Sequence, residues 1–422
     1  MELKIEGVVS MLEIRKLGLE DTASYAKLYR NAYPGFGGTQ EQAVATMNRM
    51  FSFPERAFYG VYRDDVMVGG MCLLEFEMNL RGQGMVPVGG VALVAVDLLY
   101  KKEKIAKEIM SFSLHHFRDK GIGFVTLFPF RMSFYKQMGF GSGVEHRRYS
   151  MEAASIPNFG SKANLEILSA DNLEEVIASY NRYALTRNGL TPLAKHHLEG
   201  FFKADTARVI GFRKYGELKG YMLMRFIKDH MLVNQLYIPH IVYETGEALQ
   251  EMLTFLHTQG DQFHKVNIAT QDESIHYMLS TTSTNMHDVF DSIFLETSVT
   301  GCGLMVRVID VPKLFSDLQH HNFNGETLKL KLTLEDSFLP QNTASAVIDF
   351  REGRPHVLTD ADGTADVELT LEVSNFSSLL AGTTTFDRLH RLGVAKLSDD
   401  AHVETLTRLF RTSERMMCMF AF

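Results

Sequence analysis

The chain has 422 residues, 45% of them hydrophobic and 22% charged, so two or three ordinary globular domains are expected. Its formal net charge of −8 argues against the basic face with which nucleic-acid-binding proteins hold phosphates, so no nucleic-acid partner is predicted. The three cysteines, odd in number and far apart, predict neither a disulfide framework nor a thiolate metal site, which favours a reducing cytoplasm.

The N-terminus has mixed polarity from Met1 to Ser10 and lacks the apolar core of a signal peptide, and Met11 is a candidate second start. The longest apolar run, Val88 to Val96, is far too short to span a bilayer, so no membrane partner is expected.

The first third of the chain reads as an alternation of strands and helices. In chain order we predict a strand at 12–17, a helix opened by Asp21, a helix at 40–51, a hairpin of strands 57–62 and 66–78, a strand at 85–97, a helix at 102–120, a strand at 124–128, a short helix around Tyr135 and a closing strand at 146–151. This order predicts a mixed α/β sheet with a crossover helix.

The most informative stretch is an apolar strand that leads through a basic loop into an amphipathic helix. Such a loop presents cationic side chains, free backbone N–H groups and the positive end of a helix dipole at one place, which suits a pyrophosphate. The predicted cofactor-binding residues are Val94, Ala95, Val96, Lys101, Lys102, Lys104, Ile105 and Ala106.

A second informative stretch is Phe134–Gly141, which places the Tyr135 hydroxyl on a short helix that ends at Gly139. The ordinary pKa of tyrosine, about 10, lies close to the ~8.5 of a thiol, so proton transfer between the two is not badly mismatched. Together the two stretches resemble the acetyl-CoA site of the GNAT superfamily of N-acetyltransferases.

An internal repeat marks a second unit. Residues 59–71 and 210–222 share a hairpin pattern with a charged turn and a trailing glycine. A strand at 231–238, a helix at 247–259 capped by Gly260 and a strand at 265–269 are predicted to follow. The connecting loop Pro239–Glu247 has no basic run and carries two glutamates, so we interpret this copy as structural.

The character of the chain changes again near Cys302. We predict strands at 305–310, 328–334, 345–350, 356–358 and 365–373, turns at 351–353 and 360–363, and helices at 375–381, 385–392 and 401–412. This block resembles a sterol-carrier-protein domain. The wholly apolar end, Met417–Phe422, is expected to dock on the protein rather than extend into water.

The combination resembles the Eis-type (enhanced intracellular survival) acetyltransferases, in their Firmicutes-like branch. The resemblance implies an N-terminal GNAT domain at 11–155, a GNAT-like domain without a cofactor loop at 163–300 and a sterol-carrier-like domain at 302–422. It further implies acetyl-CoA as cosubstrate, no metal, transfer to a small-molecule or peptidyl amine, and a homohexamer. It assigns Tyr135 as general acid and the terminal carboxylate of Phe422 as general base.

The sequence departs from the family at the cofactor loop, where Lys104 replaces a glycine and Leu98 replaces a proline. The rival interpretation is therefore a non-catalytic binding or scaffold protein. Glu75 and Glu77, which share one strand face, are the alternative base. The pairs His115–His116, His196–His197 and His320–His321 are interpreted as surface residues, and Cys418 has no identifiable activating base. The loop Tyr33–Gly38 offers no carboxylate, which favours an acceptor with little charge or an apolar one.

Overall fold

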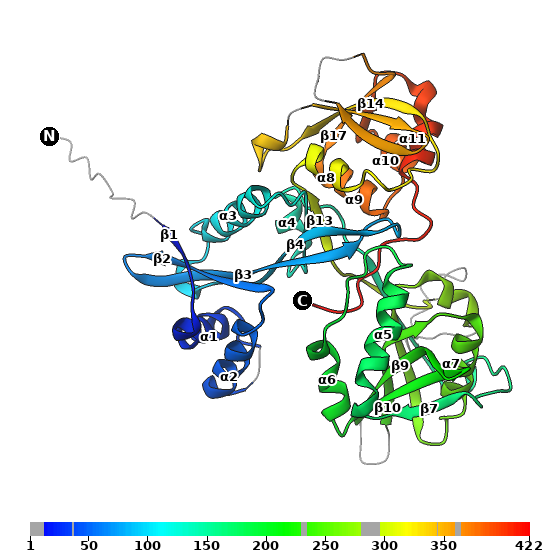
Figure 1. Cartoon of the computed structure of the whole chain (residues 1–422). Helices are drawn as coiled ribbons and strands as arrows, with labels where there is room; N and C mark the ends of the chain where they lie inside the picture. The colour runs from blue at the N-terminus through cyan, green and yellow to red at the C-terminus, as the bar shows by residue number, and fades with distance from the viewer. Residues whose placement is uncertain (1–11, 36–37, 229–233, 280–295, 344, 359–363) are drawn as a thin grey trace.

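The computed structural model describes residues 12–35, 38–228, 234–279, 296–343, 345–358 and 364–422. They form three lobes, each built on its own sheet (Figure 1), and the expected class of mixed α/β sheets is confirmed. Met11, part of the loop Tyr33–Gly38, residues 231–233 of one predicted strand and the predicted turn at 360–363 lie outside the described residues.

The first sheet has six strands. In spatial order they are β1 (Glu13–Lys16), β2 (Arg56–Arg63), β3 (Val66–Asn79), β4 (Met85–Val96), β5 (Phe124–Leu127) and β13 (Met305–Val308). Its helices are α1 (Thr22–Ala32), α2 (Gln40–Phe51), α3 (Ile105–Asp119) and α4 (Met132–Lys136). Because side chains alternate along β3, Met71 and Leu73 pack with α3, whereas Cys72 and Leu74 pack with α1 and α2 on the other face.

The second sheet has seven strands. In spatial order they are β12 (Val299–Cys302), β6 (Glu145–Met151), β11 (Phe263–Thr270), β10 (Asn234–Tyr243), β9 (Glu217–Lys228), β8 (Ala207–Lys214) and β7 (Leu165–Leu168). Its helices are α5 (Leu173–Ala184), α6 (Lys195–Lys203) and α7 (Gly246–His257). Helix α7 ends with Thr258 as its C-cap, so the prediction of Gly260 as the cap is wrong.

The two sheets repeat one topology. The order β7-β8-β9-β10-β11 reproduces β1-β2-β3-β4-β5, and in both units only the last pair of the series, β4 with β5 and β10 with β11, is parallel. The hairpins β2–β3 and β8–β9 contain the two copies of the sequence repeat. The predicted repeat is therefore a repeat of the fold.

The first and second sheets each include a strand that the sequence analysis placed in a different unit. The predicted closing strand of the first unit forms as β6, but it pairs with β11 and β12 in the second sheet. The strand predicted to open the third block forms as β13 and pairs with β5 in the first sheet (Figure 1). This differs from the prediction, because an edge strand with a suitable apolar pattern pairs with whichever sheet edge the tertiary fold brings to it.

The third sheet has five strands. In spatial order they are β16 (Arg354–Leu358), β15 (Ala346–Arg351), β14 (Leu328–Glu335), β17 (Val367–Glu372) and β18 (Ala395–Leu397). Its helices are α8 (Val311–Asp317), α9 (Val373–Ala381), α10 (Phe386–Arg391) and α11 (Val403–Phe410). Its interior is filled by phenylalanine rings that are at most 1% exposed, at positions 315, 323, 350, 376 and 410. The third sheet and its helices therefore enclose a tightly packed aromatic core.

The tip of the β3–β4 hairpin ties the three lobes together. Asn79 donates to the carbonyl of Ala184 at the end of α5, at 2.9 Å. The buried guanidinium of Arg81 donates to the carbonyls of Leu409, Phe410 and Arg411 at 3.1–3.3 Å. A cation is stabilised at the negative C-terminal end of α11. The segment after α11 therefore starts from a fixed point beside the first sheet.

Candidate active site

The first sheet opens between β4 and β5. The two strands pair only over Gly89–Val91 and Val125–Leu127, after which β5 ends while β4 continues to Val96. The predicted residues Val94, Ala95 and Val96 therefore lie beyond the last β4–β5 pair. This segment still pairs with β3 on its other edge, so only the backbone amides that point away from β3 are left without β5 as a hydrogen-bonding partner.

A bulge in β4 lies at the opening. The register with β3 shifts between Gly70 and Cys72, and Leu93 has a φ of +52°, a left-handed conformation that is costly for a bulky residue. Two tyrosines from α1 and its C-cap hold the bulge. The Tyr25 hydroxyl donates to the Leu93 carbonyl at 2.7 Å, and the Tyr33 hydroxyl donates to the Val94 carbonyl at 2.5 Å. The role of these tyrosines was not predicted from the sequence.

The basic loop follows this strand after Asp97 and a single 3-10 turn, Leu98–Tyr100. Lys102 and Lys104 have φ values of +70° and +63°, the left-handed conformation that glycine adopts without strain. Lys104 is the N-cap of α3, and its carbonyl accepts from the N–H groups of Lys107 and Glu108. The N–H groups of Ile105 and Ala106 lie in the first turn, where a helix has no internal acceptor for them. The predicted residues thus form one strand–loop–helix surface with exposed lysines, Lys101 included.

Tyr135 lies on α4, next to the end of β5, and is 3% exposed. Its ring contacts Phe130, Phe134 and Phe140, with ring centroids 5.1–6.0 Å apart. Burial, and secondarily the neighbouring Tyr33, raises the pKa of Tyr135 above its ordinary value. This corrects the sequence-based comparison with a thiol, because the buried phenol holds its proton more firmly than an exposed tyrosine.

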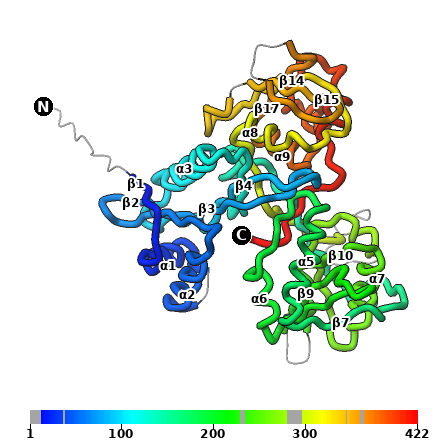
Figure 2. Tube along the Cα trace, in the orientation of Figure 1, coloured from blue at the N-terminus to red at the C-terminus, as the bar shows by residue number. Residues whose placement is uncertain are grey.

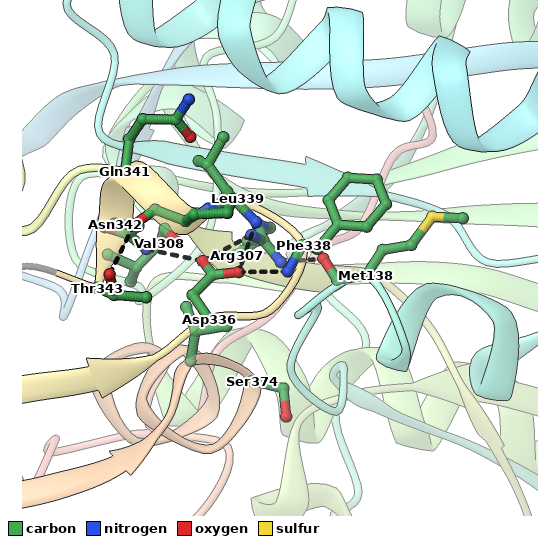
Figure 3. A network of polar contacts seen from close by, with 12 residues as sticks. Met138, Arg307, Val308, Asp336, Phe338, Leu339, Gln341, Asn342, Thr343 and Ser374 are labelled. Carbon is green, nitrogen blue, oxygen red and sulfur yellow. Dashed lines mark hydrogen bonds and ion pairs between the residues drawn. The ribbon is translucent and has the colours of Figure 1, made fainter.

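A buried ion pair fixes the turn that follows Tyr135 (Figure 3). Arg307 of β13 donates to the carbonyl of Met138 and forms a two-pronged contact with Asp336 at 2.7 and 2.9 Å. Asp336 also accepts from the backbone N–H of Leu339 at 2.9 Å and from Asn342 at 3.1 Å. The third domain therefore holds α4 in place. Neither residue was identified from the sequence, since their pairing depends on the strand exchange.

The C-terminal tail reaches the opening in the first sheet, beside β3 and β4 (Figure 2). The half-buried Phe422 ring contacts Phe76 of β3 and Phe128 just after β5, with both centroid separations 5.2 Å. A Cβ at Gly90 of β4 would stand only 3.0 Å from this ring. The expected docking of the tail is thus observed, and Phe422 and Tyr135 contact residues of the same short loop after β5.

On its way the tail fills the corresponding opening of the second sheet. Pairing of β10 with β11 ends at Ile238, and the Phe420 ring stacks on His240 just beyond, with centroids 4.3 Å apart. The Cys418 N–H donates to the Gln271 side chain. Burial lowers the pKa of His240 to about 3, so the imidazole is neutral against the ring. In the second unit, the tail therefore occupies the place where the parallel strand pair ends.

The structure separates the alternative residues from this site. Glu75 pairs with Lys120 of the segment after α3, on the face of β3 opposite to that of Phe76. Burial raises the pKa of the Cys418 thiol to about 12, so it is not a ready nucleophile. The surface assignment is wrong for His321, which is 4% exposed, whereas His320 is exposed as predicted.

Comparison with known proteins agrees with this geometry. Residues 13–143 match the family model of the acetyltransferase (GNAT) domain, and residues 311–419 match that of the sterol carrier protein domain. The chain therefore contains an acetyltransferase (GNAT) domain and a C-terminal sterol carrier protein domain. No curated relative matches the chain by sequence.

Solved structures share the fold over nearly the whole chain. A GCN5-related N-acetyltransferase from Anabaena variabilis ATCC 29413 is 18% identical, with a TM-score of 0.79 over 98% of this chain and 100% of the other. A probable N-acyltransferase from Enterococcus faecalis V583 is 18% identical, with a TM-score of 0.76 over 96% and 97%. Eis1 from Mycobacterium abscessus is 15% identical, with a TM-score of 0.76 over 98% and 100%. The Eis-type resemblance thus holds as a shared fold.

Membrane-spanning helices and metal sites are both absent from the described residues. None of the described helices combines the length and apolarity needed to cross a membrane. Within the same ranges, no group of three or more His, Cys, Asp or Glu side chains is placed to hold a metal ion.

Proposed function

We propose that the chain transfers an acetyl group from acetyl-CoA to the nitrogen of an amine. The observation that carries the proposal is the convergence of two groups that lie far apart in the sequence. Tyr135 and the terminal residue Phe422 both contact the loop after β5, next to the gap between β4 and β5. A terminal carboxylate and a phenol at one cleft supply a base and an acid.

The chain offers a matching surface for acetyl-CoA. Those amides among Val94–Val96 that point away from β3, to the open edge of β4, suit the amide-containing arm of the cosubstrate. Lys101, Lys102 and the first turn of α3 suit its pyrophosphate, because they combine positive charge with N–H donors. The left-handed φ of Lys104 gives the loop the backbone form that a glycine would provide.

In the proposed reaction, the Phe422 carboxylate accepts a proton from the acceptor ammonium, directly or through water. The free amine then forms a bond to the thioester carbon, its nitrogen gives up a second proton to solvent, and the carbon–sulfur bond breaks to leave the amide. Tyr135 donates its proton to the departing sulfur and is reprotonated from solvent. Tyr135 is protonated at neutral pH even at the ordinary tyrosine pKa of about 10, and burial raises its pKa further, so the donor form is the one present when negative charge develops on sulfur.

The decisive test is a chain with one extra glycine after Phe422, which keeps every side chain and displaces only the carboxylate. We expect release of CoA thiol with an accepted amine to fall by about a hundredfold, within the range typical of general acid–base catalysis. Tyr135→Phe should lower turnover and leave acetyl-CoA affinity nearly unchanged, because the ring still packs. Wild-type turnover of the extended chain would exclude the terminal base.

One observation favours the alternative, a non-catalytic binding or scaffold protein. Lys102 and Lys104 hold left-handed conformations that each cost roughly 1–2 kcal/mol for a non-glycine residue. Calorimetric titration with acetyl-CoA separates the two functions, since the scaffold protein gives no binding heat.

The proposal also includes a cytoplasmic homohexamer, on the basis of the Eis-type resemblance. Sedimentation at micromolar concentration tests the assembly, and a monomer mass would contradict it.

A further inference from the structure

The loop between β5 and α4 exposes two large aromatic side chains, which together form an aromatic platform. Phe128 is 38% exposed and Phe130 is 63% exposed, and only Pro129 separates them. Burying an exposed phenyl ring releases about 1.5–3 kcal/mol, so bare rings beside Tyr135 and Phe422 favour an apolar ligand.

The platform lies between the two proposed reacting groups. Phe128 contacts the ring of Phe422 at 5.2 Å, and that ring in turn contacts Phe76 at 5.2 Å. Phe130 contacts the ring of Tyr135 at 5.4 Å. An acceptor whose nitrogen lies between base and acid therefore places its body against these rings.

The charges near the platform disfavour a polycation. Arg131 directly follows Phe130, and Lys136 ends the helix that carries Tyr135; both are exposed. Glu75 and Glu77 point to the opposite face of β3 from Phe76, and Glu75 is paired with Lys120. A ligand with several ammonium groups would meet like charge at this side of the cleft.

We propose that the acceptor is a monoamine carried on an apolar, preferably aromatic, body, which stacks on the aromatic platform. This inference rests on the proposed acetyl transfer and specifies its substrate class. A monoamine carries a single positive charge, and the carboxylate of Phe422 balances it. An aromatic body gains further stability on the platform, because aromatic pairs are stabilised beyond the area they bury.

The test measures CoA release from acetyl-CoA with 2-phenylethylamine, ethanolamine and spermidine. We expect kcat/KM for 2-phenylethylamine to exceed that for each of the other amines by tenfold or more. Phe130→Ala should reduce this preference by about tenfold, mainly through a higher KM for 2-phenylethylamine. Phe159→Ala removes a 42% exposed ring from the second unit and serves as the matched control, with no change in preference.

Higher kcat/KM for spermidine, or an unchanged preference in Phe130→Ala, would overturn the inference. A Phe130→Ala chain that changes its sedimentation mass but not its preference would show a contact between copies, which also overturns it. If no amine elicits CoA release, the acetyl-transfer proposal fails separately. In that case, calorimetry measures the affinity of the protein for 2-phenylethylamine alone. This affinity must fall about tenfold in Phe130→Ala if the amine binds on the aromatic platform.

Discussion

The first and second units share a topology and differ at one place, the gap beyond the parallel strand pair. In the first unit the strand before the gap is bulged at Leu93, and the following loop is basic. In the second unit Glu244 follows β10 and is held by Arg182 at 2.7 Å, while Thr245 caps α7. Phe420 of the tail fills the region beside His240.

The same fold therefore ends its parallel strand pair beside a basic loop in the first unit and beside the docked tail in the second. A capped helix N-terminus preceded by a carboxylate repels a pyrophosphate, whereas free N–H groups beside lysines attract one. The contact of Phe420 with His240 also positions the end of the tail, because Phe422 follows two residues later and contacts the first unit. Variants of matched residues in the two units can test this contrast.

The largest expected effect concerns the ion pair that ties the first unit to the third domain. Asp336→Ala leaves Arg307 buried without its counter-ion, so the free energy of unfolding should fall by about 3–5 kcal/mol. Glu244→Ala removes the partner of the 37% exposed Arg182 in the second unit and should cost ~1 kcal/mol or less. Urea denaturation measures both. Equal losses of unfolding free energy in the two variants would show that the Arg307–Asp336 pair stabilises the protein no more than an exposed pair does.

Reversal of charge in the basic loop should weaken acetyl-CoA binding by tenfold or more. The double change Lys101→Glu and Lys102→Glu turns two charge-assisted phosphate contacts into repulsions. The control, Lys195→Glu with Lys203→Glu on α6, changes the net charge equally in the second unit. Calorimetry compares the affinities, and a similar loss in both variants would point to net charge rather than to this loop.

Loss of one tyrosine hydroxyl at the β4 bulge should slow turnover about fivefold, since a buried hydrogen bond contributes about 1 kcal/mol. Tyr33→Phe keeps the ring and removes only the donor to the Val94 carbonyl. Tyr215→Phe, on a 96% exposed ring in the second unit, should have no effect. Steady-state kcat at saturating acetyl-CoA is the measurement. Wild-type kcat in Tyr33→Phe would mean that the bulge needs no such support.

The smallest effect is relief of backbone strain. Lys104→Gly should stabilise the protein by about 1 kcal/mol, because glycine adopts the observed φ of +63° without steric cost. Lys101 has a φ of −65°, so Lys101→Gly relieves nothing and should not stabilise. Thermal melting compares the two. A lower melting temperature for Lys104→Gly would show that the lysine side chain makes contacts that outweigh the strain.

The local elements around the candidate site could be predicted from the order of the residues alone. Apolar periodicity located the strand, basic loop and helix from Val94 to Ala106, and the glycine after Tyr135 indicated a short helix there. The role of Tyr135 came only from the resemblance to the family. The hairpin repeat revealed the second unit, since strand spacing and turn residues are local properties. Composition likewise indicated that the terminal segment would dock.

The contacts between distant parts of the chain became known only from the three-dimensional arrangement. The exchange of β6 and β13 depends on which sheet edges become adjacent, and the pairing of Arg307 with Asp336 results from that exchange. The raised pKa of Tyr135 arises from burial by residues of several elements, and the path of the tail depends on the filled gap in the second unit. Side-chain periodicity reports which face of an element is apolar, and it carries no information about which distant segment covers that face.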